Sequence, residues 1–182
     1  FFLLILIYTC IYAFMSLGQN LITGYTGMLS LCGAGFFAIG SYTTAILVTK
    51  CGWSFWATLP VVAILCALMG VLIGLPTLRL KGDYLAIATL GFAEIVRNII
   101  NNWDSLTNGP MGIQRIPIIS LFGLKISPYN KYAFLLLEVI MLLICYLLLE
   151  RLASSRMGRA LEAIREDEIA SSSLGINVTK YK

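Results

Sequence analysis

The sequence predicts an all-α membrane protein, a polytopic bundle of transmembrane helices. Apolar residues make up 59% of the 182 residues and charged residues only 12%, whereas soluble domains carry about a quarter charged residues. Five apolar stretches also approach the roughly 20 residues that a helix needs to cross a bilayer. A chain this apolar cannot cover itself with polar surface in water, so lipid must be its solvent.

The five stretches define a predicted transmembrane domain over residues 1–149. Glycine, proline and charged residues separate them, and such residues favour turns. The segment 101–131 is rich in Asn, Asp, Gly and Pro, which predicts a long extracytoplasmic loop. The sequence starts with Phe1 inside an apolar run and ends at Lys182, so we expect a chain truncated at both ends. The predicted spans are approximately 1–17, 29–48, 57–75, 84–100 and 132–149.

Residues 150–182 have a different character, with six Lys/Arg and five Asp/Glu, which predicts a segment outside the hydrocarbon. Basic residues concentrate on the cytoplasmic side of membrane proteins, and four arginines follow the last span. Alternation then places the Arg79 and Lys81 turn inside as well, and the 101–131 loop outside. The basic cluster comprises Arg151, Arg156, Arg159 and Arg165.

A helix is predicted over 159–174 within this cytoplasmic segment. Leu161 and Ile164 share one face with Met157 and Ala160, at spacings of three and four residues. An amphipathic helix that follows a span can dock into a groove of a partner protein. The alternative is a solvated or interfacial loop helix.

Charged residues inside predicted spans suggest functional positions in membrane proteins. Glu94 and Arg97 are three residues apart and can neutralise each other on one helix face. They form either an ion pair that holds the bundle together or a polar wall of a translocation path. Glu138 in the last span is either close enough to the outer surface to reach water or a coupling site.

Glycines are dense between residues 24 and 40, and Gly33 and Gly35 lie among them. Transporters use glycine-broken helices at substrate sites, which makes these two residues candidates for the translocation path. Close packing of helices through small residues is the other interpretation.

Several kinds of chemistry are excluded by the sequence. It contains no histidine, and none of its five cysteines forms a C-x-x-C pair, so we expect no metal site and no catalytic residues. No G-x-x-x-x-G-K-[ST] motif is present to bind ATP phosphates. The net charge of +4 is too small and too scattered to indicate nucleic-acid binding. We therefore expect a chain that is not an enzyme and has no cofactor, and any ATP must be bound by a separate subunit.

Three segments resemble the permease subunits of branched-chain amino acid ABC transporters, and urea permeases are close relatives of these. The similarity is ordered and correctly spaced over roughly residue 21 to the end. It is carried by GYTGMLSLCGAGFFAIGSY at 24–42, LRLKGDYLAIATLGFAEIVRNIINNWDSLTNGPMGI at 78–113 and SSRMGRALEAIREDEIASSSLGIN at 154–177.

The resemblance implies a multi-pass protein of the bacterial inner membrane that works with four kinds of neighbour. These are a second homologous permease, two cytoplasmic ATP-binding subunits, a periplasmic solute-binding protein and the lipid bilayer. It also implies a cytoplasmic coupling helix that docks on the ATPase. Ile169 departs from the family pattern, which has Glu there. The residues that match the coupling region are Met157, Gly158, Arg159, Ala160, Leu161, Ala163, Ile164 and Gly175.

The expected function is the translocation pathway of an ATP-driven importer for branched-chain or other hydrophobic amino acids. One alternative is a urea or amide importer of the same family. Others are an ion-coupled secondary transporter or channel, for which Glu94 or Glu138 could serve as the coupling site, and a scaffold subunit that transports nothing.

Overall fold

The computed structural model describes residues 1–77, 80, 82–114, 116–117, 119–121, 124–126 and 131–181. Arg79 and Lys81, which contributed to the predicted orientation, lie outside these residues. The chain divides into two compact units, and each is described by itself. Unit 1 comprises Phe1–Ser30, Leu78–Ala86 and Leu135–Lys182, and unit 2 comprises Leu31–Thr77 and Ile87–Phe134.

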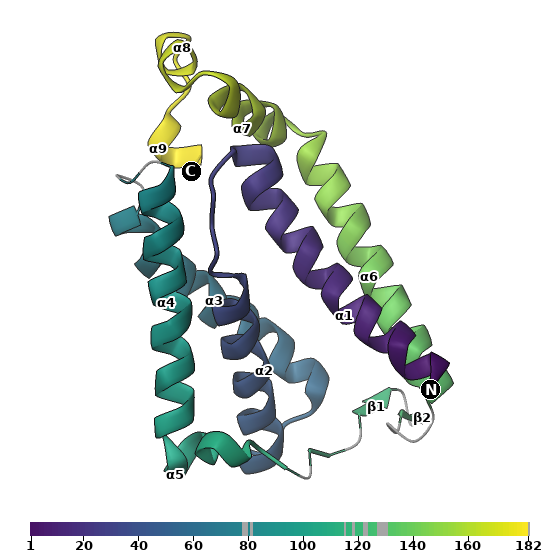
Figure 1. The fold of residues 1–182 in the computed structure, drawn as a ribbon. Helices are drawn as coiled ribbons and strands as arrows, with labels where there is room; N and C mark the ends of the chain where they lie inside the picture. The colour runs from purple at the N-terminus through teal and green to yellow at the C-terminus, as the bar shows by residue number, and fades with distance from the viewer. Residues whose placement is uncertain are drawn as a thin grey trace. The chain divides into compact units, whose positions relative to one another are not determined.

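Unit 1 is built on two long helices that lie side by side, α1 (Phe2–Asn20) and α6 (Lys131–Ala153) (Figure 1). Leu17 and Asn20 of α1 and Tyr146 of α6 line a shared apolar groove of about 540 Å³. The chain leaves α1 through a single π-helical turn, η1. The remaining elements of the unit are η1 (Leu21–Tyr25), α7 (Arg156–Glu166), α8 (Glu168–Ser173) and α9 (Val178–Tyr181).

Unit 2 contains the other three long helices, α2 (Gly33–Lys50), α3 (Phe55–Thr77) and most of α4 (Asp83–Asn102). Helices α2 and α3 pack most extensively, and Thr58 of α3 is fully buried. The predicted loop that follows α4 contains short elements of secondary structure. It forms α5 (Asp104–Thr107), η2 (Gly109–Met111) and an antiparallel hairpin of β1 (Ile119–Leu121) and β2 (Leu124–Ile126).

The predicted helical membrane fold is confirmed, with the short hairpin as an addition. A helix of at least 18 residues overlaps each of the five predicted spans, although α2 begins at Gly33, four residues later than the predicted span 29–48. In the described chain, three helical segments are both long and apolar enough to cross a membrane: Phe2–Tyr25, Phe55–Thr77 and Lys131–Ala153. Helices α2 and α4 are long enough but more polar, because α2 carries Gly, Ser and Thr and α4 carries three charges. Their assignment as spans stays a prediction.

Candidate functional site

The helix that follows α6 begins with a strong start signal. Ser155 is the N-cap of α7, and its hydroxyl accepts hydrogen bonds from the backbone N–H groups of Met157 (3.1 Å) and Gly158 (3.4 Å). These groups have no partner inside the helix, so the cap stabilises the first turn. Gly158 sits against the end of α6, where an added Cβ would lie 1.9 Å from the carbonyl oxygen of Ala153. Only glycine fits this turn between α6 and α7.

The apolar face of α7 is covered by the chain itself. Gly158, Leu161 and Ile164 are buried, and α7 contacts η1, α8 and α9. The other predicted coupling residues of this helix lie toward solvent: Ala160 and Ala163 are half-buried, and Met157 and Arg159 are exposed. A partner that approaches this unit therefore meets the solvent-facing residues of α7, while its buried residues hold α7 against the rest of the unit.

The prediction of one helix over 159–174 is wrong in its bounds. Helix α7 begins three residues earlier and ends at Glu166, and Asp167 starts a second helix. The carboxylate of Asp167 accepts hydrogen bonds from the N–H groups of Ile169 (2.8 Å) and Ala170 (3.0 Å). Its backbone is extended (φ −153°, ψ 111°), because an N-cap residue lies outside the helical region.

The second helix presents an apolar surface that sequence reasoning did not assign. The side chains of Ile169 and Leu174 are 77% and 83% exposed. Gly175 follows with φ +86° and reverses the chain after the helix, as the predicted helix stop requires. The signal in the sequence was the departure at Ile169, an apolar residue where the resembled family has a charge. We define the docking surface as Met157, Arg159, Ile169 and Leu174.

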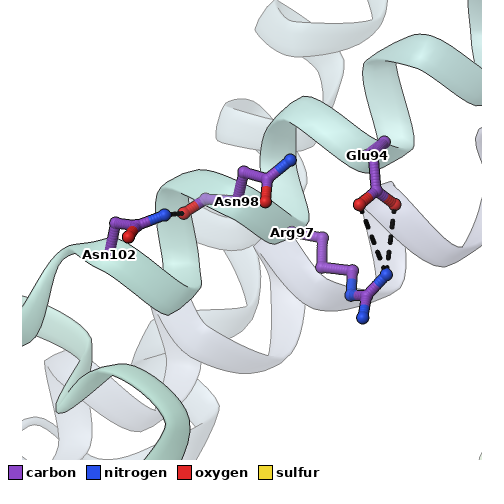
Figure 2. A network of polar contacts seen from close by, with 4 residues as sticks. All are labelled: Glu94, Arg97, Asn98 and Asn102. Atoms are coloured by element: carbon purple, nitrogen blue, oxygen red, sulfur yellow. Dashed lines mark hydrogen bonds and ion pairs between the residues drawn. The ribbon is translucent and has the colours of Figure 1, made fainter.

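Glu94 and Arg97 are brought together on α4, as their spacing predicted (Figure 2). Nη1 of Arg97 lies 3.3 Å from each carboxylate oxygen of Glu94. The two side chains are 55% and 71% exposed. Figure 2 also shows Asn98, which directly follows Arg97, and Asn102 one turn beyond it, whose side-chain amide donates to the Asn98 backbone carbonyl at 2.8 Å.

The polar pair lies opposite the packed side of its helix. Leu85, Thr89 and Val96 are buried, and their spacing of four and seven residues places them on one face. Thr89 also accepts a hydrogen bond from the backbone N–H of Leu31 at 2.9 Å. In the last half of α4, the exposed polar residues Glu94, Arg97, Asn98 and Asn102 lie beside exposed Ile95 and Ile99. Exposed charges are costly against hydrocarbon, so this part of α4 suits a water-filled path or a protein partner.

Gly35 is a packing residue in this structure. It is buried, and an added Cβ would lie 3.1 Å from Cα of Ala93 on α4 and 3.2 Å from the Phe92 ring. Phe36 contacts the same aromatic ring, with centroids 5.7 Å apart. Gly33 is the first residue of α2 and is half-buried. The close approach of α2 and α4 favours the packing interpretation of Gly35, and the path role of both glycines stays a prediction.

Glu138 lies on α6 with one buried carboxylate oxygen. Oε2 has no hydrogen-bond partner among the residues that the structure describes. A buried carboxylate oxygen without a donor is unfavourable, so this position is suited to receive a proton or a donor from another segment.

The chain matches a known family over its whole length. The family model for the branched-chain amino acid transport system permease component covers residues 1–182. The chain is 43% identical to the Salmonella typhimurium protein named high-affinity branched-chain amino acid transport system permease protein LivM, over 96% of this chain and 46% of that protein. The Escherichia coli protein of the same name is 42% identical with the same coverage.

A more distant relative comes from Methanocaldococcus jannaschii. It is named probable branched-chain amino acid transport permease protein LivM and is 26% identical, over 98% of this chain and 61% of its own length. The chain thus spans about half the length of the two bacterial relatives. No solved structure matches the chain. The match over all 182 residues and the two bacterial relatives show that this multi-pass membrane chain belongs to the branched-chain amino acid transport system permease family.

Proposed function

We propose that the chain forms part of the translocation pathway of an ATP-driven importer for branched-chain or other hydrophobic amino acids. The family membership and the names of the bacterial relatives support this proposal. Because the sequence has no phosphate-binding loop, two separate subunits bind ATP on the cytoplasmic side of a bacterial inner membrane. A second homologous permease and a periplasmic solute-binding protein complete the importer.

The observation that carries the proposal is the construction of the α7–α8 segment. It follows the span α6, its inner face is held by η1 and α9, and its outer face presents the docking surface. A segment that is anchored on one side and exposes Ile169 and Leu174 on the other can transmit the movement of a docked partner to the spans. In the importer, ATP binding and hydrolysis in the partner then bias the permease between outward- and inward-facing arrangements.

Reconstitution tests the proposal directly. The protein is assembled in liposomes with its second permease, ATP-binding subunits and solute-binding protein. We expect uptake of leucine that requires ATP inside the cytoplasmic compartment, and no such uptake of urea. ATP-dependent uptake of urea without uptake of leucine would show that the substrate is an amide and not a hydrophobic amino acid. Uptake that does not depend on ATP would reject the importer.

The polar face of α4 is proposed to line the solute path. Replacing both charges, Glu94→Gln with Arg97→Gln, should lower leucine uptake about tenfold, because hydrogen bonds to charged groups contribute about 1.5 kcal/mol or more. Assembly, measured by co-purification of the subunits, should persist because neither side chain is buried in the described chain.

The single variants provide the control for this experiment. Each leaves one uncompensated charge in the span, so each should assemble less well than the double variant. If the double variant instead loses assembly while the little complex that forms transports normally, the pair holds subunits together and lines no path.

Glu138 favours a second candidate, an ion-coupled transporter, because its Oε2 atom has no donor within the described part of the chain. The two mechanisms differ in their driving force. For the importer, we expect Glu138→Gln to retain ATP-dependent uptake within about twofold, since a neutral amide relieves the buried oxygen. Leucine uptake driven by a proton gradient without ATP, and abolished by Glu138→Gln, would establish the ion-coupled mechanism instead.

A further inference from the structure

Helix α1 ends in a π-helical turn, η1, which contacts α7. Residues Leu21–Tyr25 close this turn at the end of α1, and π-turns inside α-helices frequently mark functional positions. The last four carbonyls of any helix lack partners within it, and together they carry a partial negative charge. Gly24 belongs to this set.

Arg165 of α7 binds this helix end. Its Nη1 donates a hydrogen bond to the carbonyl oxygen of Gly24 at 2.5 Å, across 141 residues of sequence. A guanidinium at a helix C-terminus is favourable for two reasons, the charge-assisted hydrogen bond and the attraction to the helix dipole. The contact lies entirely within unit 1.

The stem of Arg165 is held as closely as its head. Gly27 has φ +68°, and an added Cβ there would lie 2.8 Å from Cγ and 3.5 Å from Cβ of Arg165. The positive φ favours glycine at this position, and a side chain here would meet the stem of Arg165. Gly27, through packing, and the Gly24 carbonyl, through a hydrogen bond, together bind the Arg165 side chain.

The same helix face supplies the apolar part of the attachment. Ile164, next to Arg165, is 3% exposed and Leu161 is 6% exposed, on the helix that contacts η1 and α9. Two kinds of contact therefore hold α7 at the end of α1: burial of side chains, which is not directional, and one hydrogen bond with a fixed geometry.

We propose that Arg165 is the positioning residue that makes α7 and the η1 end of α1 move as one body. This rests on the proposed function, in which a partner ATPase displaces the α7–α8 segment. Without Arg165 the buried side chains still hold α7, but α7 can slide over η1, and the displacement is lost before it reaches the span.

The first test removes the guanidinium. Arg165→Gln in the assembled importer should keep ATP hydrolysis and lower leucine uptake per ATP about tenfold, the expected loss of one hydrogen bond to a charged group. Arg156→Gln removes the same charge from the same helix at an exposed position and should leave uptake per ATP unchanged. Equal uptake per ATP in both variants would overturn the proposal.

The second test replaces the lost tie by a covalent one. An ideal Cβ at position 27 lies 3.5 Å from Cβ of Arg165, within the range that a disulfide spans, about 3.5–4.5 Å. The double variant Gly27→Cys with Arg165→Cys should be uncoupled when reduced and should recover uptake per ATP when oxidised. The control is Arg165→Cys alone, oxidised in the same way, which shows any effect of disulfides with the five native cysteines. This variant should stay uncoupled.

The outcomes separate this inference from the proposed function. If the unaltered importer shows ATP-dependent uptake but oxidation of the double variant lowers uptake per ATP further, α7 and η1 must slide during transport and the proposal is wrong. If the unaltered importer shows no ATP-dependent uptake at all, the proposed function is wrong, and the inference about Arg165 is wrong as well because it rests on that function.

Discussion

Replacing Gly158 by alanine is expected to destabilise the protein by about 2–3 kcal/mol, the upper part of the range for overpacked sites. The added Cβ would lie 1.9 Å from the carbonyl oxygen of Ala153 and 2.5 Å from its carbonyl carbon. Backbone atoms cannot rotate away as a flexible side chain can, so the first turn of α7 must shift from its Ser155 cap. We expect a lower melting temperature in detergent and loss of leucine uptake.

Gly18→Ala is the matched control, because it adds the same methyl group to a helix. An added Cβ at Gly18 meets nothing within 4 Å, and alanine favours helix over glycine by about 0.5–1 kcal/mol. The control should therefore be neutral or more stable than the parent. Melting temperatures for the two variants that agree within error would contradict the tight α6–α7 turn.

Placing charges at Ile169 of α8 and at its C-cap residue, by Ile169→Asp with Leu174→Asp, is expected to weaken binding of the ATP-binding subunits at least about tenfold. Both side chains are mostly exposed in this chain, so the substitutions should not disturb its own packing. At a docked interface, however, each aspartate would bury an unpaired charge, which is strongly unfavourable. The measurement is the affinity of the detergent-solubilised permease pair for the ATP-binding subunits.

Met111 offers a matched control for this experiment. It is 76% exposed and belongs to the segment predicted to lie on the other side of the membrane. Met111→Asp should leave affinity for the ATP-binding subunits unchanged. If the α8 variant also binds them normally but associates less with lipid vesicles, α8 is an interfacial helix and the docking assignment is refuted.

The sequence predicts the long helices well because their signal is composition over about 20 residues. The bounds differ where local geometry decides them. Residues 55–56 and 76–77 extend α3 beyond the prediction of 57–75 at both ends, with Pro60 and Pro76 inside the helix. At the end of α1, the π-turn accepts a hydrogen bond from Arg165, a contact with a residue far along the chain that no local pattern reveals.

The coupling region was predictable in position and less so in detail. The apolar spacing of Leu161 and Ile164 reveals that one face is covered, but spacing cannot show whether a partner or the same chain covers it. In the structure η1 and α9 lie against this helix. The break between α7 and α8 at Asp167 had a local signal, since aspartate is a preferred N-cap. The charged residues around Asp167, however, are equally typical of one continuous solvated helix.

For the polar pair on α4, the sequence spacing predicts the interaction between the two side chains but not their exposure. A spacing of three residues predicts that Glu94 and Arg97 interact, and they do. The exposure of these two side chains depends on which face of α4 packs against neighbouring segments. Leu31, which is far away in sequence, contacts that packed face through its hydrogen bond to Thr89. The role of Gly35 likewise depends on Ala93 of another helix, and no local pattern reveals that approach.

Photocross-linking from position 169 tests the central claim most directly. A photoreactive phenylalanine analogue replaces Ile169 in the protein assembled with its partner subunits in native membranes, and the same analogue replaces Met111 in a parallel sample. We predict cross-links from position 169 to the ATP-binding subunit and none from position 111. Cross-links to the ATP-binding subunit from position 111, or only to lipid from position 169, would contradict the account.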